Sequence, residues 1–439
     1  MRALLVVLVA FAMVCSGCTC GAKSGAGGAA EAGAADLAGD AGPAGAGAAK
    51  TMETAADLSA PVGAAHAPGG AVLVAGLVAA RHVIALSRIE PSGAIAWTRD
   101  VLGGIGWMPD ADVRVYAAPD GGALVTVRAL RDGKPARALV GVDPAGQPRG
   151  EIEDVGSGAC ATDEGLSWVR RDAGGKASLV ARSWAEARGR AGGALPDGDP
   201  ILVCGTRRVF ALVEGDESLG LVQGEKVAPL LRGPDFTGES DRDHIEYTVG
   251  DELGVVSPGL PGVTAFREVD AAKVGTWRRL SHRLEEDDDV VAVDADARSL
   301  FVVVTRDDGE ACADGERRTR LHLLRTERHG AGELEAPLAS LDCGVSAGPY
   351  WTGFIGGALV VAWPERPPKK GSSSPPVSGL GFVTFDGDRA SDVSRSAIAA
   401  DAIVDAGCDA AACYAVALTR PEGTDGMVPG AARVVRYPR

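Results

Sequence analysis

Short runs of Val, Leu, Ile and Ala recur along most of the chain, each bounded by Gly, Pro or Asp-Gly. Examples are GGAVLVAGLVAARHVIALSRIEPSGAIAWTRDV at 69–101, VRVYAAPDGGALVTVRAL at 113–130 and ARSLFVVVTRDDGE at 297–310. Apolar runs of this length between such turn residues are typical of strands joined as hairpins. Helical periodicity is nearly absent, so the pattern predicts an all-β body.

The strand pattern repeats coarsely. Repeats begin near residues 60, 110, 158, 200, 241, 290, 346 and 400. Each has a first strand, a tight turn and a strongly apolar second strand, and most continue with a more polar pair. Tandem four-stranded repeats are what a β-propeller requires. We therefore expect a seven- or eight-bladed β-propeller over 61–439, with the second strand of each blade buried on both faces.

Two further expectations follow from this repeat. The last repeat is short, so its blade would be completed by a strand from the N-terminal side. Tandem β-sandwiches are the alternative architecture, because the strand pattern alone fits both.

The N-terminus carries Arg2 and then an apolar run from Ala3 to Val14. This run is too short to cross a bilayer core of about 30 Å as a helix, but it fits the apolar part of a secretory signal. Small residues, Ser16 and Gly17, precede Cys18. Residues 1–17 are therefore predicted to be an export signal.

The stretch around Cys18 resembles the lipobox of bacterial lipoproteins, although Cys15 stands where that family usually has an aliphatic residue. The resemblance implies that Cys18 becomes the mature N-terminus and carries lipid through a thioether, which would attach the protein to a lipid bilayer. An ordinary cleaved signal is the alternative. Thr19 is not the Asp that retains enterobacterial lipoproteins in the inner membrane, so we expect an exported protein at the outer membrane or cell surface.

Residues 18–60 consist mainly of Ala and Gly. Repeated Gly disfavours a helix, and no apolar periodicity offers a packing face. We expect a disordered, flexible tether; an Ala-rich helix is the alternative.

The composition and net charge of the chain limit the classes of partner that it could bind. The chain has 439 residues, 46% of them hydrophobic, and a net charge of −15. The hydrophobic fraction suffices for a large core, and the charge disfavours nucleic acid, which basic patches bind.

Beyond Cys20 the sequence has an even number of cysteines, which indicates disulfides in an exported protein. Proximity along the chain suggests the pairs Cys160–Cys204, Cys312–Cys343 and Cys408–Cys413. No CxxC pair or suitably spaced His accompanies them, so no metal site is expected there.

Catalytic motifs are scarce. The chain has no phosphate loop and no H-E-x-x-H. DRDHIEY at 241–247 gathers acidic residues around His244, but such a cluster is usually a solvated loop. FDGDRASD at 385–392 is spaced somewhat like a calcium loop, yet Ser391 replaces the required Gly. No cofactor is predicted.

Two functions remain. In the first, the propeller is a non-catalytic scaffold for envelope proteins or polymers; at the level of architecture alone, it resembles lipid-anchored periplasmic propellers that act as assembly scaffolds. In the second, it is a glycan hydrolase or lyase with acidic residues at a central channel. The enzyme predicts that several acidic and His residues converge, namely Asp241, Asp243, His244, Asp294 and Asp296. The tryptophans that could stack a sugar are Trp107, Trp168, Trp351 and Trp363.

Overall fold

The computed structural model describes residues 50–53 and 58–438. The exceptions are residues 107, 109, 157, 197–199, 216–217, 224–225, 233–244, 261–262, 271–272, 276–277, 280–287, 312–316, 368–375, 409–411 and 420–430. The described chain forms eight antiparallel sheets. Its helical segments are two short 3₁₀ turns, Pro68–Gly70 and Ala79–Arg81.

Each of the first four sheets is built from consecutive strands. Blade 1 contains β2 (Ser59–His66), β3 (Val72–Val78), β4 (Val83–Ile89) and β5 (Ile95–Gly103). Blade 2 contains β6 (Ile105–Gly106), β7 (Asp112–Ala117), β8 (Ala123–Arg131), β9 (Lys134–Val142) and β10 (Glu153–Asp154). Blade 3 contains β11 (Ala159–Thr162), β12 (Gly165–Arg171), β13 (Ala177–Ser183) and β14 (Arg190–Ala194). Blade 4 contains β15 (Pro200–Cys204), β16 (Val209–Gly215), β17 (Ser218–Gln223) and β18 (Lys226–Arg232).

The remaining sheets follow the same order, except that the last also includes the first strand of the chain. Blade 5 contains β19 (Ile245–Val249), β20 (Glu252–Leu260), β21 (Val263–Asp270), β22 (Lys273–Val274) and β23 (Arg278–Arg279). Blade 6 contains β24 (Asp289–Ala295), β25 (Ser299–Ala311), β26 (Arg317–Glu327) and β27 (Glu333–Ser340). Blade 7 contains β28 (Ser346–Ala347), β29 (Trp351–Ile355), β30 (Ala358–Arg366), β31 (Val377–Asp386), β32 (Arg389–Ala390) and β33 (Ser394–Ala400). Blade 8 contains β34 (Ala402–Cys408), β35 (Ala412–Thr419), β36 (Ala431–Pro438) and β1 (Lys50–Glu53).

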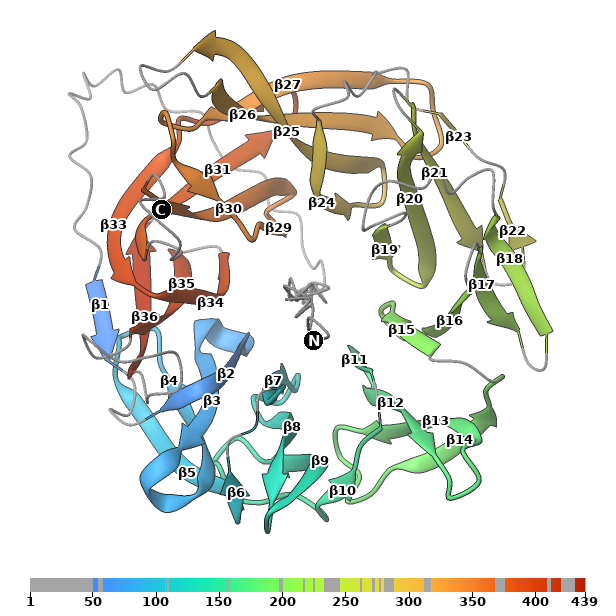
Figure 1. The fold of residues 1–439 in the computed structure, drawn as a ribbon, viewed down its shortest axis with the longest axis vertical. Coiled ribbons are helices and arrows are strands. Elements are labelled where there is room, and N and C mark those ends of the chain that lie inside the picture. The colour runs from blue at the N-terminus through green and yellow to red at the C-terminus, as the bar shows by residue number, and fades with distance from the viewer. Residues whose placement is uncertain are drawn as a thin grey trace, which may run out of the picture.

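The eight sheets stand around a central axis, and the strands nearest that axis are β2, β7, β11, β15, β19, β24, β29 and β34 (Figure 1). The protein is thus an eight-bladed β-propeller, as the sequence pattern predicted. Tandem sandwiches, the alternative, are not the architecture. The inner strands begin close to the predicted repeat starts because a long apolar strand follows each of them after a tight turn.

Strand β1 closes the ring. It pairs antiparallel with β36, with Lys50 opposite Arg436 and Glu53 opposite Arg433. An N-terminal strand therefore completes the last blade, which confirms the sequence expectation. The four residues of β1 and the first residues of β2 lie within 18–60, so the ring contains part of the range that was assigned to the tether.

The core is divided among the seams between blades. Each of eight clusters of buried residues joins two neighbouring blades, and the cluster around Leu58 and Val416 joins the last to the first. Along β25, Val302 belongs to one cluster and Val303 to another. Alternate residues of a strand point to opposite faces, so a strand between two seams must be apolar throughout. This accounts for the unbroken apolar second strands.

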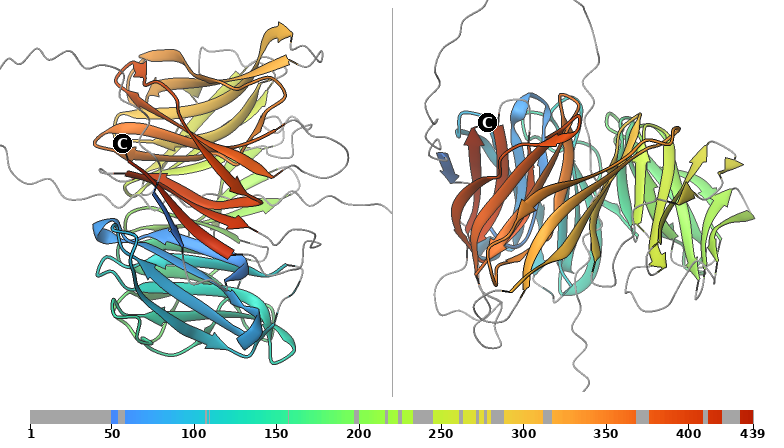
Figure 2. Two further views of the ribbon diagram at one scale, coloured as in Figure 1. Left: turned by 90° about the vertical axis from the view of Figure 1, so that its left-hand side faces the viewer. Right: turned by 90° about the horizontal axis from the view of Figure 1, so that it is seen from above.

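The ring has two distinct faces. Seen edge-on, the strands cross the thickness of the ring, so that their ends lie at opposite faces (Figure 2). We call one the turn face; it carries the turns between first and second strands, such as Pro68–Gly70 and the pair Gly356 and Gly357. We call the other the loop face; it carries the links between blades, such as 341–350, and between second and third strands, such as 172–176.

The chain enters the ring at the turn face. Strand β1 runs antiparallel to β36, which in turn runs antiparallel to β35. Because β35 starts at the turn face, Lys50 lies at that face and Glu53 lies toward the loop face. The longer connections, for example 233–244 and 420–430, start and finish at strand ends on the loop face.

Candidate functional site

The inner strands of blades 2, 5, 6 and 8 carry carboxylates. In all eight inner strands, Asp and Glu occur at Asp112, Glu246, Asp289, Asp294 and Asp405. Arg114 is the single Lys or Arg in those strands, and it forms an ion pair with Asp112 at 2.9 Å. The inner strands of blades 5, 6 and 8 therefore carry Asp or Glu but no Lys or Arg.

Asp294 lies at the seam between blades 6 and 7. It is only 9% exposed, and the backbone N–H of Ala295 donates to its Oδ1 at 2.8 Å. The side chain of Thr352, on the inner strand of blade 7, lies beside the carboxyl group and acts to lower its pKa. Burial nevertheless raises the pKa of Asp294 to about 6, and the nearby charge of Asp296 acts in the same direction.

Asp405 lies near the seam that closes the ring. Burial raises its pKa to about 6 as well. In contrast to Asp294, it has a strong side-chain donor, because the Tyr414 hydroxyl donates to Asp405 Oδ2 at 3.0 Å. The Tyr414 ring stacks on His66 of blade 1, with centroids 5.6 Å apart and planes inclined by 16°. Arg436 also donates to the backbone oxygen of Gly70 across this seam.

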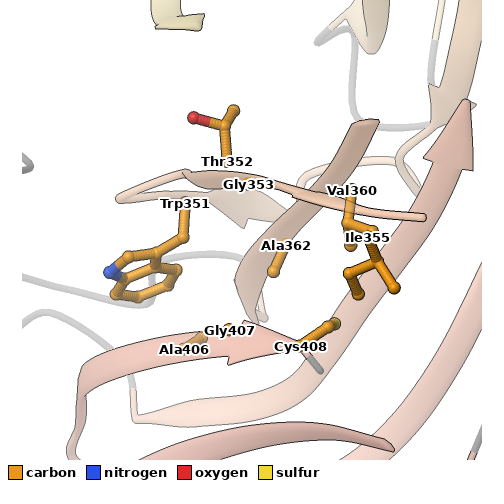
Figure 3. Close-up of a pocket in the computed structure, with 9 residues that line it drawn as sticks. All are labelled: Trp351, Thr352, Gly353, Ile355, Val360, Ala362, Ala406, Gly407 and Cys408. Atoms are coloured by element: carbon orange, nitrogen blue, oxygen red, sulfur yellow. The ribbon is translucent and has the colours of Figure 1, made fainter. Parts of the chain in front are cut away.

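A small slot opens between the inner strands of blades 7 and 8 (Figure 3). It is lined by Trp351, Thr352, Gly353, Ile355, Val360, Ala362, Ala406, Gly407 and Cys408. Its volume of about 30 Å³ accommodates one or two water molecules, whereas ligand pockets typically measure about 300–1,000 Å³. The slot can receive a water or one small apolar group, but not a sugar ring.

The structure tests only part of the expected acidic convergence. Asp241, Asp243 and His244 lie outside the described residues. Asp294 and Asp296 are close to one another on blade 6, where Asp296 accepts backbone hydrogen bonds from Arg298 and Ser299 in the following turn, both at 2.7 Å.

Few of the four candidate tryptophans are placed where a sugar ring could stack on them. Trp168 and Trp363 are buried in the seams, with exposures of 1% and 0%, so they cannot stack a ligand. Trp107 lies outside the described residues. Trp351 is half-buried beside the slot.

Two predicted disulfides are confirmed. Cys160–Cys204 joins the inner strands of blades 3 and 4, and Cys408–Cys413 spans the first hairpin of blade 8, with Cα atoms 5.6 and 3.8 Å apart. Cys343 is disulfide-bonded; Cys312, its predicted partner, lies outside the described residues.

The structure describes only some of the residues to which the predictions on lipid attachment and metal binding refer. Cys18 and its neighbours lie outside the described residues. Within the described part of the chain, no helix is long and apolar enough to span a membrane. The same part contains no group of three or more His, Cys, Asp or Glu side chains suited to a metal ion.

The sequence analysis overlooked Thr352, Asp405 and His66. A usable signal existed for Asp405, since AIVDAGC at 402–408 places a carboxylate inside an apolar inner strand, as DVVAVDA does at 289–295. A lone Thr or His carries no comparable signal, because its role depends on the blade beside it.

Comparison with known proteins adds the following. No family model matches the chain, and no curated protein matches it. Among solved structures, BamB from Moraxella catarrhalis is 13% identical, covering 88% of this chain and 98% of that one, with a TM-score of 0.44. The polysaccharide lyase Uly1 is 9% identical, with coverages of 88% and 92% and a TM-score of 0.43. A structure from a study of two prolyl endopeptidases is 12% identical, with coverages of 82% and 55% and a TM-score of 0.47. The blade count and topology come from the strand pairing, and the function remains to be argued from this chain.

Proposed function

We propose that this protein is a lipid-anchored lipoprotein of the bacterial envelope, attached through Cys18, whose propeller is a non-catalytic scaffold for a protein or envelope polymer. The lipobox-like residues before Cys18 support the anchor. Residues 19–49 would form the tether, whose root-mean-square reach as a Gly-rich coil is roughly 30 Å.

The observation that carries the proposal is the position at which the chain joins the ring. Lys50 begins β1 at the turn face, so a tether ending there would bring that face toward the bilayer. The strand ends at the loop face, from which the links between blades start, would then face away from the membrane. Binding residues often lie in loops held by a rigid scaffold, so the loop face is the surface offered to a partner.

The small volume of the slot and the burial of two tryptophans support a binding role. The slot beside Trp351 has a volume of about 30 Å³, too small for a glycan. Two of the four candidate stacking residues, Trp168 and Trp363, are buried in the core. These features favour a scaffold over a glycan hydrolase or lyase.

The anchor can be tested by labelling cells with a palmitate analogue and fractionating their membranes. We expect the wild-type protein to carry label and to sediment with membranes. Cys18→Ser should lose both properties, and Cys20→Ser, the matched control two residues away, should keep both. Unlabelled wild-type protein, or equal labelling of the Cys18→Ser variant, would contradict the anchor.

A further inference from the structure

The carboxylate of Asp294 is an incompletely satisfied buried group. Its residue is 9% exposed, and Oδ2 is buried without a hydrogen-bond partner among the described residues. A buried carboxylate is costly unless it is paired, coordinated or neutralised. A native orphan of this kind therefore calls for an ion, a water or a proton.

The charges around Asp294 do not supply the missing partner. None of the ion pairs found in the described part of the chain includes Asp294. The charged neighbour that perturbs its pKa is a second carboxylate, Asp296, which raises it further. Asp296 lies just beyond the end of β24, in the turn before β25, where its Oδ1 accepts the backbone N–H groups of Arg298 and Ser299.

Asp405 shows how this fold satisfies a comparable carboxylate with its own side chains. It is also on an inner strand, and burial raises its pKa to about 6 as well. Its Oδ2, however, receives the Tyr414 hydroxyl at 3.0 Å. Asp294 Oδ2 has no equivalent donor in the described residues.

We propose that Asp294, with Thr352 and Asp296, forms a weak binding site for a small oxygen-seeking divalent cation such as Ca²⁺ between the inner strands of blades 6 and 7. Carboxylate and hydroxyl oxygens are the ligand types that hard cations take. The side chain of Thr352 points to the opposite side of β29 from that of Trp351 (Figure 3), although Thr352 is also one of the residues that line the slot.

The ligand set predicts modest affinity. Two carboxylates and one hydroxyl leave part of the coordination shell to backbone carbonyls or water. Weak extracellular calcium sites have dissociation constants of roughly 0.1–1 mM, and we expect a value in that range. A bound cation would link blades 6 and 7 beside the axis. This inference does not depend on the proposed lipid anchor.

The test is calorimetric titration of CaCl₂ into the full chain after EDTA treatment and dialysis. We expect one site on the wild-type protein and at least a tenfold loss of affinity in Asp294→Asn. Asp405→Asn is the matched control, because it removes another buried inner-strand carboxylate, and it should bind like the wild type. Thr352→Val should weaken binding, and Thr352→Ser should largely restore it.

Thermal unfolding guards against misfolded variants. Ca²⁺ at 5 mM should raise the Tm of the wild type and Asp405→Asn but leave the Tm of Asp294→Asn unchanged. No binding to the wild type at millimolar Ca²⁺ would overturn the proposal and leave a proton or a water as the partner of Asp294. Equal binding by folded Asp294→Asn would overturn it as well, because the cation would then bind elsewhere.

Discussion

Tyr414 and Asp405 illustrate how single side chains hold the closing seam of the ring. The Tyr414 hydroxyl donates to the half-buried carboxylate of Asp405 at 3.0 Å, and leaving a desolvated acceptor without its donor costs about 1–3 kcal/mol. We expect Tyr414→Phe to lower the free energy of unfolding by that amount at pH 7.5. Denaturant titration followed by tryptophan fluorescence measures it.

A matched control is Tyr116→Phe, because the Tyr116 hydroxyl donates to the neutral backbone oxygen of Ala159 at 3.1 Å. Its expected cost is about 0.5–1.5 kcal/mol. The excess cost of Tyr414→Phe should shrink near pH 5, where Asp405 is largely protonated. An excess that does not change with pH would mean that the hydrogen bond does not depend on the ionised carboxyl.

The two buried carboxylates also predict a pH dependence of stability. Burial raises the pKa of Asp294 and of Asp405 to about 6, from the usual value of 3.8. The unfolded state then binds fewer protons than the folded state between these values, so stability falls as pH rises through that window. The metal-free wild-type protein should lose stability from pH 4 to pH 7, and Asp294→Asn/Asp405→Asn should lose less.

The double variant must be compared with the wild type because His322 changes stability with pH in the opposite direction. Burial, and then the charge of Arg306, lower the pKa of His322, so its protonation in the unfolded state destabilises the fold as pH falls below about 6.5. If the double variant follows the same pH curve as the wild type, the two carboxylates do not contribute.

Among the elements, the disulfide between β11 and β15 joins two blades. Cys160 and Cys204 are separated by 44 residues, whereas Cys408 and Cys413 are separated by 5. Loop-closure entropy gives about 4 kcal/mol for the longer loop and about 2 kcal/mol for the shorter one. We expect Cys160→Ala/Cys204→Ala to lower the Tm more than Cys408→Ala/Cys413→Ala, measured by calorimetry. The reverse order would show that the seam between blades 3 and 4 does not need its covalent link.

Buried ion pairs make further links between blades, and these were not predictable from the sequence. Arg328 is 3% exposed and reaches from blade 6 to Glu252 and Glu268 of blade 5. Arg182 is 1% exposed on blade 3 and pairs with Glu153 of blade 2 at 3.1 Å. In the sequence both arginines resemble ordinary exposed residues of polar strands or turns, because their partners lie in another repeat.

At the scale of the whole molecule, the apolar second strands made the fold predictable, since a strand between two seams must be apolar on both faces. The exact blade number was less accessible because blades 5 and 7 each contain divided or extra short strands, such as β28 and β32. The candidate site was least predictable. Asp294 was a candidate from sequence, but its contact with Thr352 exists only where two blades meet.

Ring closure gives a prediction at this scale. A chain beginning at residue 50 keeps β1, whereas one beginning at residue 54 exposes the outer edge of β36, and unpaired edges promote association. We expect the longer form to be a stable monomer and the shorter form to unfold at lower temperature and to associate. Size-exclusion chromatography and thermal unfolding measure both. Identical behaviour would show that β1 is dispensable.

The central claim is that an anchored ring presents its loop face to an envelope partner. The most direct measurement is photo-crosslinking in cells from single exposed positions, with Lys176 and Asp401 on the loop face and Glu164 and Asp388 on the turn face. We expect a defined envelope partner to be crosslinked from the loop-face positions, with little crosslinking from the turn-face positions and loss of the crosslinks in the Cys18→Ser form. No partner from either face, or the same partner at full yield without the anchor, would contradict it.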